Sequence, residues 1–210
     1  MKHLSLLAFL IPTLLLAEAE HEEIGKRIVP KVESSEDEMQ QKQANFIYDR
    51  FPMVYVGNDV HTLVAVSALG DSVEIEDGSV WKVSTYDGFK AKGWRSSDPL
   101  TITQNHSWFS SYTYRIVNRN TGASIDANLF LGPFTNGAYS RYVQSIDLTQ
   151  GLVTLTDNTH WEVSDSDKST FRNWMANDSV IIGVNTGWDS ACEGLLINVT
   201  TNNHVRAHQF

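Results

Sequence analysis

The sequence VEIEDGSVWKVS, residues 73–84, determines the fold that we expect. Apolar residues alternate with charged or polar ones on both sides of Asp77-Gly78, a dipeptide that is typical of a tight hairpin turn. The stretch therefore predicts two short antiparallel strands that share one apolar face. Similar short stretches, separated by turn residues, follow at 100–103, 114–118 and 124–128. Short strands that turns separate so closely are typical of a sandwich or a barrel, and not of βαβ units.

The pattern returns 80 residues later, and no gap is needed to align the two stretches. VTLTDNTHWEVS, residues 153–164, lies over residues 73–84, and all six tryptophans form pairs at this offset. The pairs are Trp81/Trp161, Trp94/Trp174 and Trp108/Trp188, and Asp98/Asp178, Asn105/Asn185 and Asn118/Asn198 follow the same spacing. A match of this length indicates an internal duplication. We expect a first β-module at 57–131 and a second module, which repeats the first, at 137–210.

The expected class is all-β, with two tandem small barrels of five to six strands that are SH3-like or OB-like. A single continuous β-sandwich is the alternative. A module of about 75 residues buries a modest share of its surface on folding and is only marginally stable alone. Because the linker at 132–136 is short, we expect the two modules to pack against each other.

The N-terminus has the pattern of a secretory signal peptide. Lys2 and His3 precede an apolar run over 4–16, and Ala17-Glu18-Ala19 supplies small residues at the positions that a signal peptidase reads. We therefore expect a signal peptide at 1–19 and a periplasmic or secreted protein, with a retained N-terminal anchor as the alternative. No other stretch approaches the ~18 apolar residues that a spanning helix needs, so no stable membrane span is expected after cleavage.

Residues 20–56 are expected to form an acidic linker with a short helix. Ser35 and Glu38 have the spacing of a capping box, which places the helix near 36–49. A flexible tether or an arm that binds a partner is an equally consistent interpretation.

Overall charge argues against two classes of partner. The chain has 25 acidic and 16 basic residues, which give a formal net charge of −9. An acidic surface repels phosphate backbones, and no run of Lys and Arg interrupts the sequence. We therefore expect no nucleic-acid partner and no electrostatic adhesion to anionic lipid.

Motifs of known catalytic or metal chemistry are absent from the sequence. Cys192 is the single cysteine and cannot form an internal disulfide, and its expected role is that of a small, partly buried apolar residue. We find no HExxH, no zinc spacing, no Gly-x-Ser-x-Gly and no P-loop, and the histidines do not recur at the 80-residue offset. We therefore expect no metal, no cofactor and no catalytic residue, and a protein that is not an enzyme.

The paired aromatic and acidic residues are the candidate site. Trp81 and Trp161 share a strand face with valines, so their expected place is the core. The other tryptophans lie in turn-rich connections, where a ring either closes the end of a barrel or stands exposed to stack on a sugar or a proline. Asp98 and Asp178 either cap a turn or contact a polar ligand. The candidate ligand-binding set is therefore Trp94, Trp108, Trp174, Trp188, Asp98 and Asp178.

The pattern Asp-Gly-Ser-x-Trp-x-Val, Trp-x-x-x-Asp-Pro and Asn-x-x-Trp, found between Asp77 and Trp108, resembles modules of small exported bacterial proteins, especially of bacteria with an obligate intracellular lifestyle. The second copy departs from it at Asn158, Thr159 and Ser179. The resemblance implies a bacterial envelope or secreted setting. It supplies no activity, so no catalytic residue is carried over.

These observations favour an exported, non-enzymatic binding or structural module of the bacterial envelope. It would recognise a protein or a glycan through its loop aromatics, or a protein strand at an exposed sheet edge. The alternative is a hydrolase that acts on envelope polymers, with its site between the two modules. Converging carboxylates or a Ser/His pair in a cavity there would favour this alternative.

Overall fold

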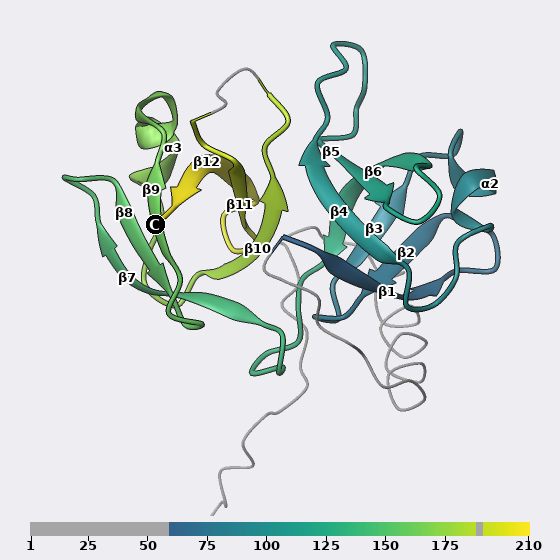
Figure 1. Ribbon diagram of the computed structural model, residues 1–210, viewed down its shortest axis with the longest axis horizontal. Coiled ribbons are helices and arrows are strands. Elements are labelled where there is room, and N and C mark those ends of the chain that lie inside the picture. The colour runs from purple at the N-terminus through teal and green to yellow at the C-terminus, as the bar shows by residue number, and fades with distance from the viewer. Residues whose placement is uncertain (1–58, 188–190) are drawn as a thin grey trace, which may run out of the picture.

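The computed structural model describes residues 59–187 and 191–210, and within these ranges the chain is almost entirely β-structure (Figure 1). The elements are β1 (His61–Val66), β2 (Ser72–Ile75), β3 (Val80–Val83), α2 (Gly88–Ala91), β4 (Pro99–Gln104), β5 (Tyr114–Asn118), β6 (Ser124–Leu131), β7 (Arg141–Asp147), β8 (Leu152–Leu155), β9 (His160–Val163), a 3₁₀ turn at Asp165–Asp167, α3 (Lys168–Phe171), β10 (Ser179–Val184), β11 (Gly194–Asn198) and β12 (Asn203–Gln209).

The first six strands form a closed barrel, which we call the N-terminal barrel. Their order is β1-β2-β3-β6-β5-β4, and the additional pairing of β1 with β4 closes the ring. The expectation of an all-β protein with a small six-stranded barrel is therefore confirmed. The predicted hairpin also forms between β2 and β3, where Gly78 adopts a φ of +86° and the Ser79 N–H donates to Asp77 Oδ1 (2.7 Å).

The other six strands, which we call the C-terminal strand set, follow the order β7-β8-β9-β12-β11-β10, and β7 also pairs with β10. Adjacent β4 and β10 connect the two groups and run parallel, with Thr103 opposite Val184. The hairpin turn of this set carries Asn158 at a φ of +62°, and the Thr159 N–H donates to Asp157 Oδ1 (3.0 Å). Each group thus has the same strand order and the same turn contact.

Trp81 and Trp161 are buried, as their position on the strands predicts. Each ring satisfies its N–H with the hydroxyl two residues earlier: Trp81 Nε1 donates to Ser79 Oγ (3.0 Å), and Trp161 Nε1 donates to Thr159 Oγ1 (2.8 Å). Burying an aromatic ring of this size stabilises the fold by a few kcal/mol, roughly.

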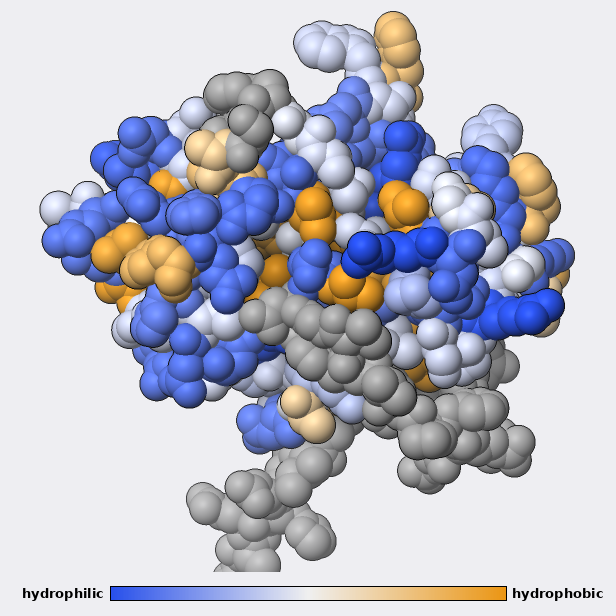
Figure 2. All heavy atoms as spheres, viewed as in Figure 1, coloured by the Kyte–Doolittle hydropathy of each residue, from blue (hydrophilic) through white to orange (hydrophobic). Residues whose placement is uncertain are grey.

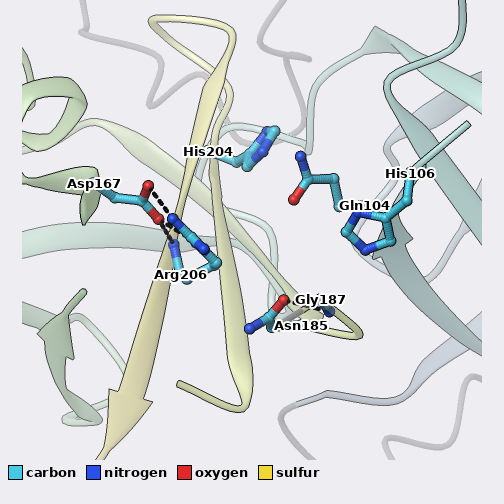
Figure 3. A pocket seen from close by; sticks show the side chains of 7 residues that line it. All are labelled: Gln104, His106, Asp167, Asn185, Gly187, His204 and Arg206. Atoms are coloured by element: carbon cyan, nitrogen blue, oxygen red, sulfur yellow. Dashed lines mark hydrogen bonds and ion pairs between the residues drawn. The ribbon is translucent and has the colours of Figure 1, made fainter. Parts of the chain in front are cut away.

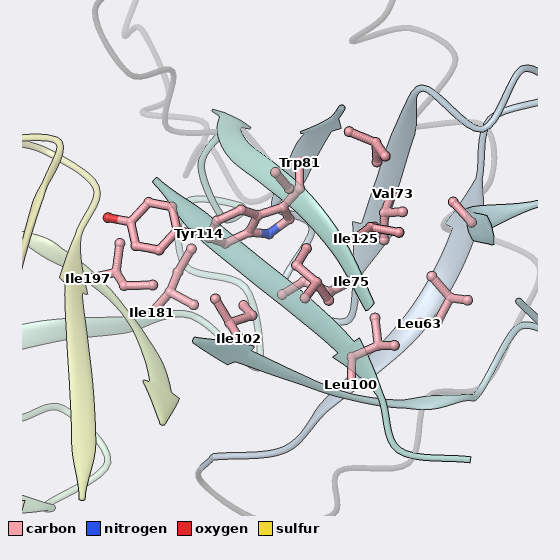
Figure 4. Packing of buried hydrophobic residues seen from close by; sticks show 14 of the residues in the cluster. Leu63, Val73, Ile75, Trp81, Leu100, Ile102, Tyr114, Ile125, Ile181 and Ile197 are labelled. Atoms are coloured by element: carbon pink, nitrogen blue, oxygen red, sulfur yellow. The ribbon is translucent and has the colours of Figure 1, made fainter. Parts of the chain in front are cut away.

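The junction between the two groups is apolar and continuous with the core of the N-terminal barrel. Ile181, Leu195, Ile197 and Val199, all from the C-terminal half of the chain, belong to the same buried cluster as the barrel residues. Figure 4 shows Ile181 and Ile197 pointing toward barrel residues that include Tyr114 and Ile102.

One glycine allows β10 to lie against β4. A Cβ on Gly183 would lie 2.5 Å from the carbonyl oxygen of Ile102, which no side chain tolerates without a shift of backbone. The close approach therefore depends on a residue without a side chain.

The expected signal peptide at 1–19 and the expected helix near 36–49 lie outside the described residues. Within the part that the structure describes, no helix has the length and hydropathy to cross a membrane.

Candidate binding site beside two long loops

Two of the four candidate tryptophans are buried. Trp94 packs in the core of the N-terminal barrel, and Trp174 packs in the core of the C-terminal strand set, where its Nε1 donates to Asn203 Oδ1 (2.8 Å). Both rings close the interior beside the short helices α2 and α3. A buried ring presents no face to a ligand, so we remove this pair from the candidate site.

Asp98 and Asp178 act as turn caps. Asp98 Oδ2 accepts hydrogen bonds from the Arg95 N–H (2.9 Å) and from Asn118 Nδ2 (2.6 Å). Asp178 Oδ2 accepts the equivalent bonds from the Met175 N–H (2.8 Å) and Asn198 Nδ2 (2.7 Å). Burial raises the pKa of Asp98, but these donors and Asn120 outweigh it and hold the pKa below its ordinary value. Both carboxylates are thus engaged by the fold, and we remove them as well.

Trp108 is the exposed member of the set. It lies in the loop at 105–113 with 92% of its surface exposed, and its neighbour Phe109 is 96% exposed. Sequence reasoning missed Phe109, although two adjacent aromatic residues in a turn-rich segment are themselves a signal. Trp188, the remaining candidate, lies outside the described residues.

The loop at 105–113 and the loop that follows β10 leave from the same end of the molecule, because β4 and β10 run parallel (Figure 1). An asparagine fixes the base of each loop. Asn105 Nδ2 donates to the carbonyl oxygen of Tyr112 (3.0 Å), and Asn185 Nδ2 donates to that of Cys192 (2.7 Å). Each asparagine thus satisfies a backbone carbonyl of its own loop. Cys192 is buried, as expected.

A polar cavity of about 190 Å³ lies between the bases of these loops (Figure 3). Side chains from both halves of the chain surround it. The lining residues are Gln104 and His106 from the N-terminal barrel side, and Asp167, Asn185, Gly187, His204 and Arg206 from the C-terminal strand set. The sequence contains no motif that joins these residues, and the scattered histidines gave no signal because none recurs at the 80-residue offset.

The cavity wall carries little net charge. Arg206 Nε and Nη2 donate to Asp167 Oδ2 (2.8 Å) and Oδ1 (2.7 Å), so these two side chains neutralise each other. Burial works against ionisation of Asp167, but the bonds from Arg206 outweigh it and lower the pKa of the carboxyl. Burial also lowers the pKa of His204, so its imidazole is neutral at pH 7, and its Nδ1 lies 3.3 Å from the Tyr114 hydroxyl.

The described lining of this cavity holds neither a pair of converging carboxylates nor a Ser/His pair. Asp167 is the one carboxylate in that lining, and Arg206 engages both of its oxygens. No serine lines this cavity among the described residues. A second, more open hollow of about 430 Å³ is lined by residues of the C-terminal half of the chain alone, among them Ser164, Ser166, Glu162, Asp165, Cys192 and His208. His208 Nδ1 there lies 2.8 Å from Glu193 Oε2.

Within the described ranges, no group of three or more His, Cys, Asp or Glu side chains is arranged to hold a metal ion. Comparison with protein-family models, with curated proteins and with solved structures finds no match.

Proposed function

We propose that the chain is an exported, non-enzymatic binding protein of the bacterial envelope that recognises a glycan. The observation that carries this proposal is the fully exposed Trp108 on a loop whose base, at His106, lines a polar and nearly neutral cavity. One sugar residue would occupy the cavity, and Trp108 and Phe109 would offer apolar faces to the neighbouring part of the ligand.

The chemistry of the cavity favours neutral hydroxyl groups over an anion. The Gln104 amide offers both a hydrogen-bond donor and an acceptor, and the neutral His204 imidazole adds a further uncharged polar group, which is what a hydroxyl group needs. An anion is recognised best by donors with a net positive charge, whereas the Arg206 guanidinium here is neutralised by Asp167. A protein partner at the aromatic loop is the competing outcome.

The architecture belongs to the same proposal. We infer that the C-terminal strand set is a second copy of the N-terminal barrel, produced by duplication, as two tandem modules at 57–131 and 137–210. Matched strand orders, matched turn caps and matched tryptophan pairs at the 80-residue offset support this. The signal-peptide pattern at 1–19 supports a periplasmic or secreted location.

A glycan array probed with the exported protein, followed by calorimetry on the sugars that bind, tests the proposal. We expect saturable binding that Trp108→Ser weakens about tenfold and that Gln104→Ala also weakens. Tyr86→Ser, which removes an equally exposed ring elsewhere, is the matched control and leaves binding unchanged.

Two outcomes contradict the proposal. In the first, a crosslinking pull-down captures one protein in stoichiometric amount, Trp108→Ser abolishes this capture, and no glycan binds. The partner is then a protein and not a glycan. Turnover of a cell-wall polymer that disappears in His106→Ala shows an enzyme.

A further inference from the structure

A second exposed surface lies on the N-terminal barrel, away from the loops described above. Phe89 (73% exposed) lies on helix α2, Tyr86 (86%) lies two residues before the helix, and Leu69 (72%) lies in the turn between β1 and β2. The turn that carries Leu69 packs on the start of the helix, since a Cβ on Gly70 would lie 2.1 Å from the carbonyl oxygen of Gly88. The three exposed side chains therefore come from two adjacent segments of the surface, and together with Lys90 and Lys92 we call them the α2 patch. Exposed apolar patches of this kind mark interaction surfaces.

Lysines border these exposed side chains directly. Lys92 Cγ lies 3.0 Å from the Cβ position of Gly70, beside the Leu69 turn, and Lys90 Nζ lies 5.9 Å from the centroid of the Phe89 ring. Figure 2 shows apolar and strongly hydrophilic residues side by side at the right-hand edge, where Figure 1 places α2.

The corresponding position in the C-terminal strand set provides an internal comparison. Helix α3 lies 80 residues after α2 and has the same anchor: Asp87 Oδ2 accepts from the Asp126 N–H (2.9 Å), and Asp167 Oδ2 accepts from the Arg206 N–H (2.8 Å). Yet the exposed residues at the same offset from Leu69, Tyr86 and Phe89 are Thr149, Ser166 and Ser169. The fold therefore does not require apolar residues at these positions.

Charge differs between the two positions in the same way. Residues 82–95 contain four basic residues and one acidic residue, whereas residues 162–175 contain two basic and three acidic residues. Two carboxylates moderate the positive charge around α2: Asp87 pairs with Lys90 (2.6 Å), and Asp71 lies in the Leu69 turn. The surface around α2 remains basic on a chain that is acidic as a whole.

We propose that the α2 patch docks the protein reversibly on an anionic lipid surface. Aromatic and leucine side chains that protrude beside lysines match the boundary of a bilayer, where rings enter the headgroup region and ammonium groups meet phosphates. The net charge of −9 does not prevent this, because salt screens charges beyond about 10 Å and only the contacting face is close enough to act. The net charge led us to expect no adhesion to anionic lipid, and the proposal departs from that expectation at the α2 patch alone.

Co-sedimentation with vesicles tests the proposal. The probes are vesicles of phosphatidylcholine alone and of phosphatidylcholine mixed with phosphatidylglycerol, and the protein is the exported chain purified from the periplasm. We expect binding to the mixed vesicles, weaker binding at high salt and little binding to phosphatidylcholine alone. The triple variant Leu69→Thr/Tyr86→Ser/Phe89→Ser, which installs the residues of the corresponding position, should lower partitioning at least about tenfold.

Matched variants separate this surface from the others. Met175→Ser removes a similarly exposed apolar side chain from the C-terminal strand set and should leave partitioning unchanged. Lys92→Gln should weaken partitioning at low salt only. The triple variant should still bind any glycan that the wild-type protein binds, so failure here and failure of the proposed function are distinguishable.

Three outcomes overturn the proposal: no binding of wild-type protein to either vesicle, binding that the triple variant retains, or binding that is lost only in Trp108→Ser/Phe109→Ser. Binding of polyglutamate through the patch, without vesicle binding, assigns the surface to an acidic protein instead.

Discussion

A buried ion pair at the junction of the two groups makes stability depend on pH. His61 and Glu76 are both buried, and His61 Nδ1 lies 2.7 Å from Glu76 Oε1. His61 Nε2 lies 2.7 Å from the carbonyl oxygen of Ile182 on β10. Because both neighbouring atoms are acceptors, both ring nitrogens must donate, and the imidazole is in its charged form.

The direction of the pH effect follows from the pKa of His61. Burial alone would lower that pKa, but the Glu76 carboxylate and its hydrogen bond outweigh burial and raise it from 6.5 to about 9. Because the pKa of His61 is higher in the folded than in the unfolded state, its protonated imidazole stabilises the folded state. This contribution is complete below pH 6.5 and is lost as the pH rises through 9. The difference corresponds to about 3 kcal/mol of unfolding free energy. Burial raises the pKa of Asp77 to about 6, so most of its own titration is complete at pH 7.

Urea unfolding followed by tryptophan fluorescence, at about pH 7 and about pH 9.5, measures the effect. We expect the unfolding free energy of the wild-type protein to fall by about 2 kcal/mol between these conditions, because part of the contribution is already lost at pH 7. His61→Gln removes the titrating group and should show little of this fall. Glu76→Gln leaves His61 buried without its counter-charge and should cost about 3–5 kcal/mol at pH 7. A wild-type stability that is the same at both pH values, or an equal fall in His61→Gln, would refute the reasoning.

Three further predictions concern the fold and the exposed ring. Asp98→Ala leaves the Asn118 amide and other buried donors without an acceptor, so we expect a loss of about 2–4 kcal/mol in urea unfolding, and a loss under ~0.5 kcal/mol would contradict the capping role. Gly183→Ala drives a methyl group into the Ile102 carbonyl, so thermal unfolding should show a loss of about 1–3 kcal/mol. Trp108→Phe should remove the emission component that acrylamide quenches most readily, without a change in stability; unchanged quenching would place the Trp108 ring in the interior.

Local chemistry explains the features that could be predicted from the sequence. Alternation of apolar residues over 73–84 predicts strands because side chains of a strand point alternately to opposite faces. Asp77-Gly78 predicts the hairpin because few residues adopt a positive φ without strain. The turn cap was one of the two roles expected for Asp98, and its local part is the hydrogen bond from the N–H three residues earlier, whereas the bonds from Asn118 and Asn120 depend on the tertiary structure.

The candidate site could be predicted only in part. Trp94 and Trp108 look alike in the sequence, since both lie among Gly, Ser and Asn or Asp, yet Trp94 folds into the barrel core behind α2 and Trp108 stands in solvent. No local pattern distinguishes them, because burial depends on what the rest of the chain places above each ring. Net charge likewise averages over the whole surface, and it therefore conceals the basic surface around α2.

By itself, the sequence determined the strand pattern, the hairpin turns and the burial of Trp81 and Trp161, because each depends on the period and turn chemistry of a few adjacent residues. Tertiary structure alone decided three things: which loop aromatic is exposed, that His106 and His204 share a cavity, and that His61 contacts Ile182, 121 residues away along the chain. The physical reason is that these contacts depend on how the strands close and on the parallel approach of β4 and β10, which local patterns do not encode.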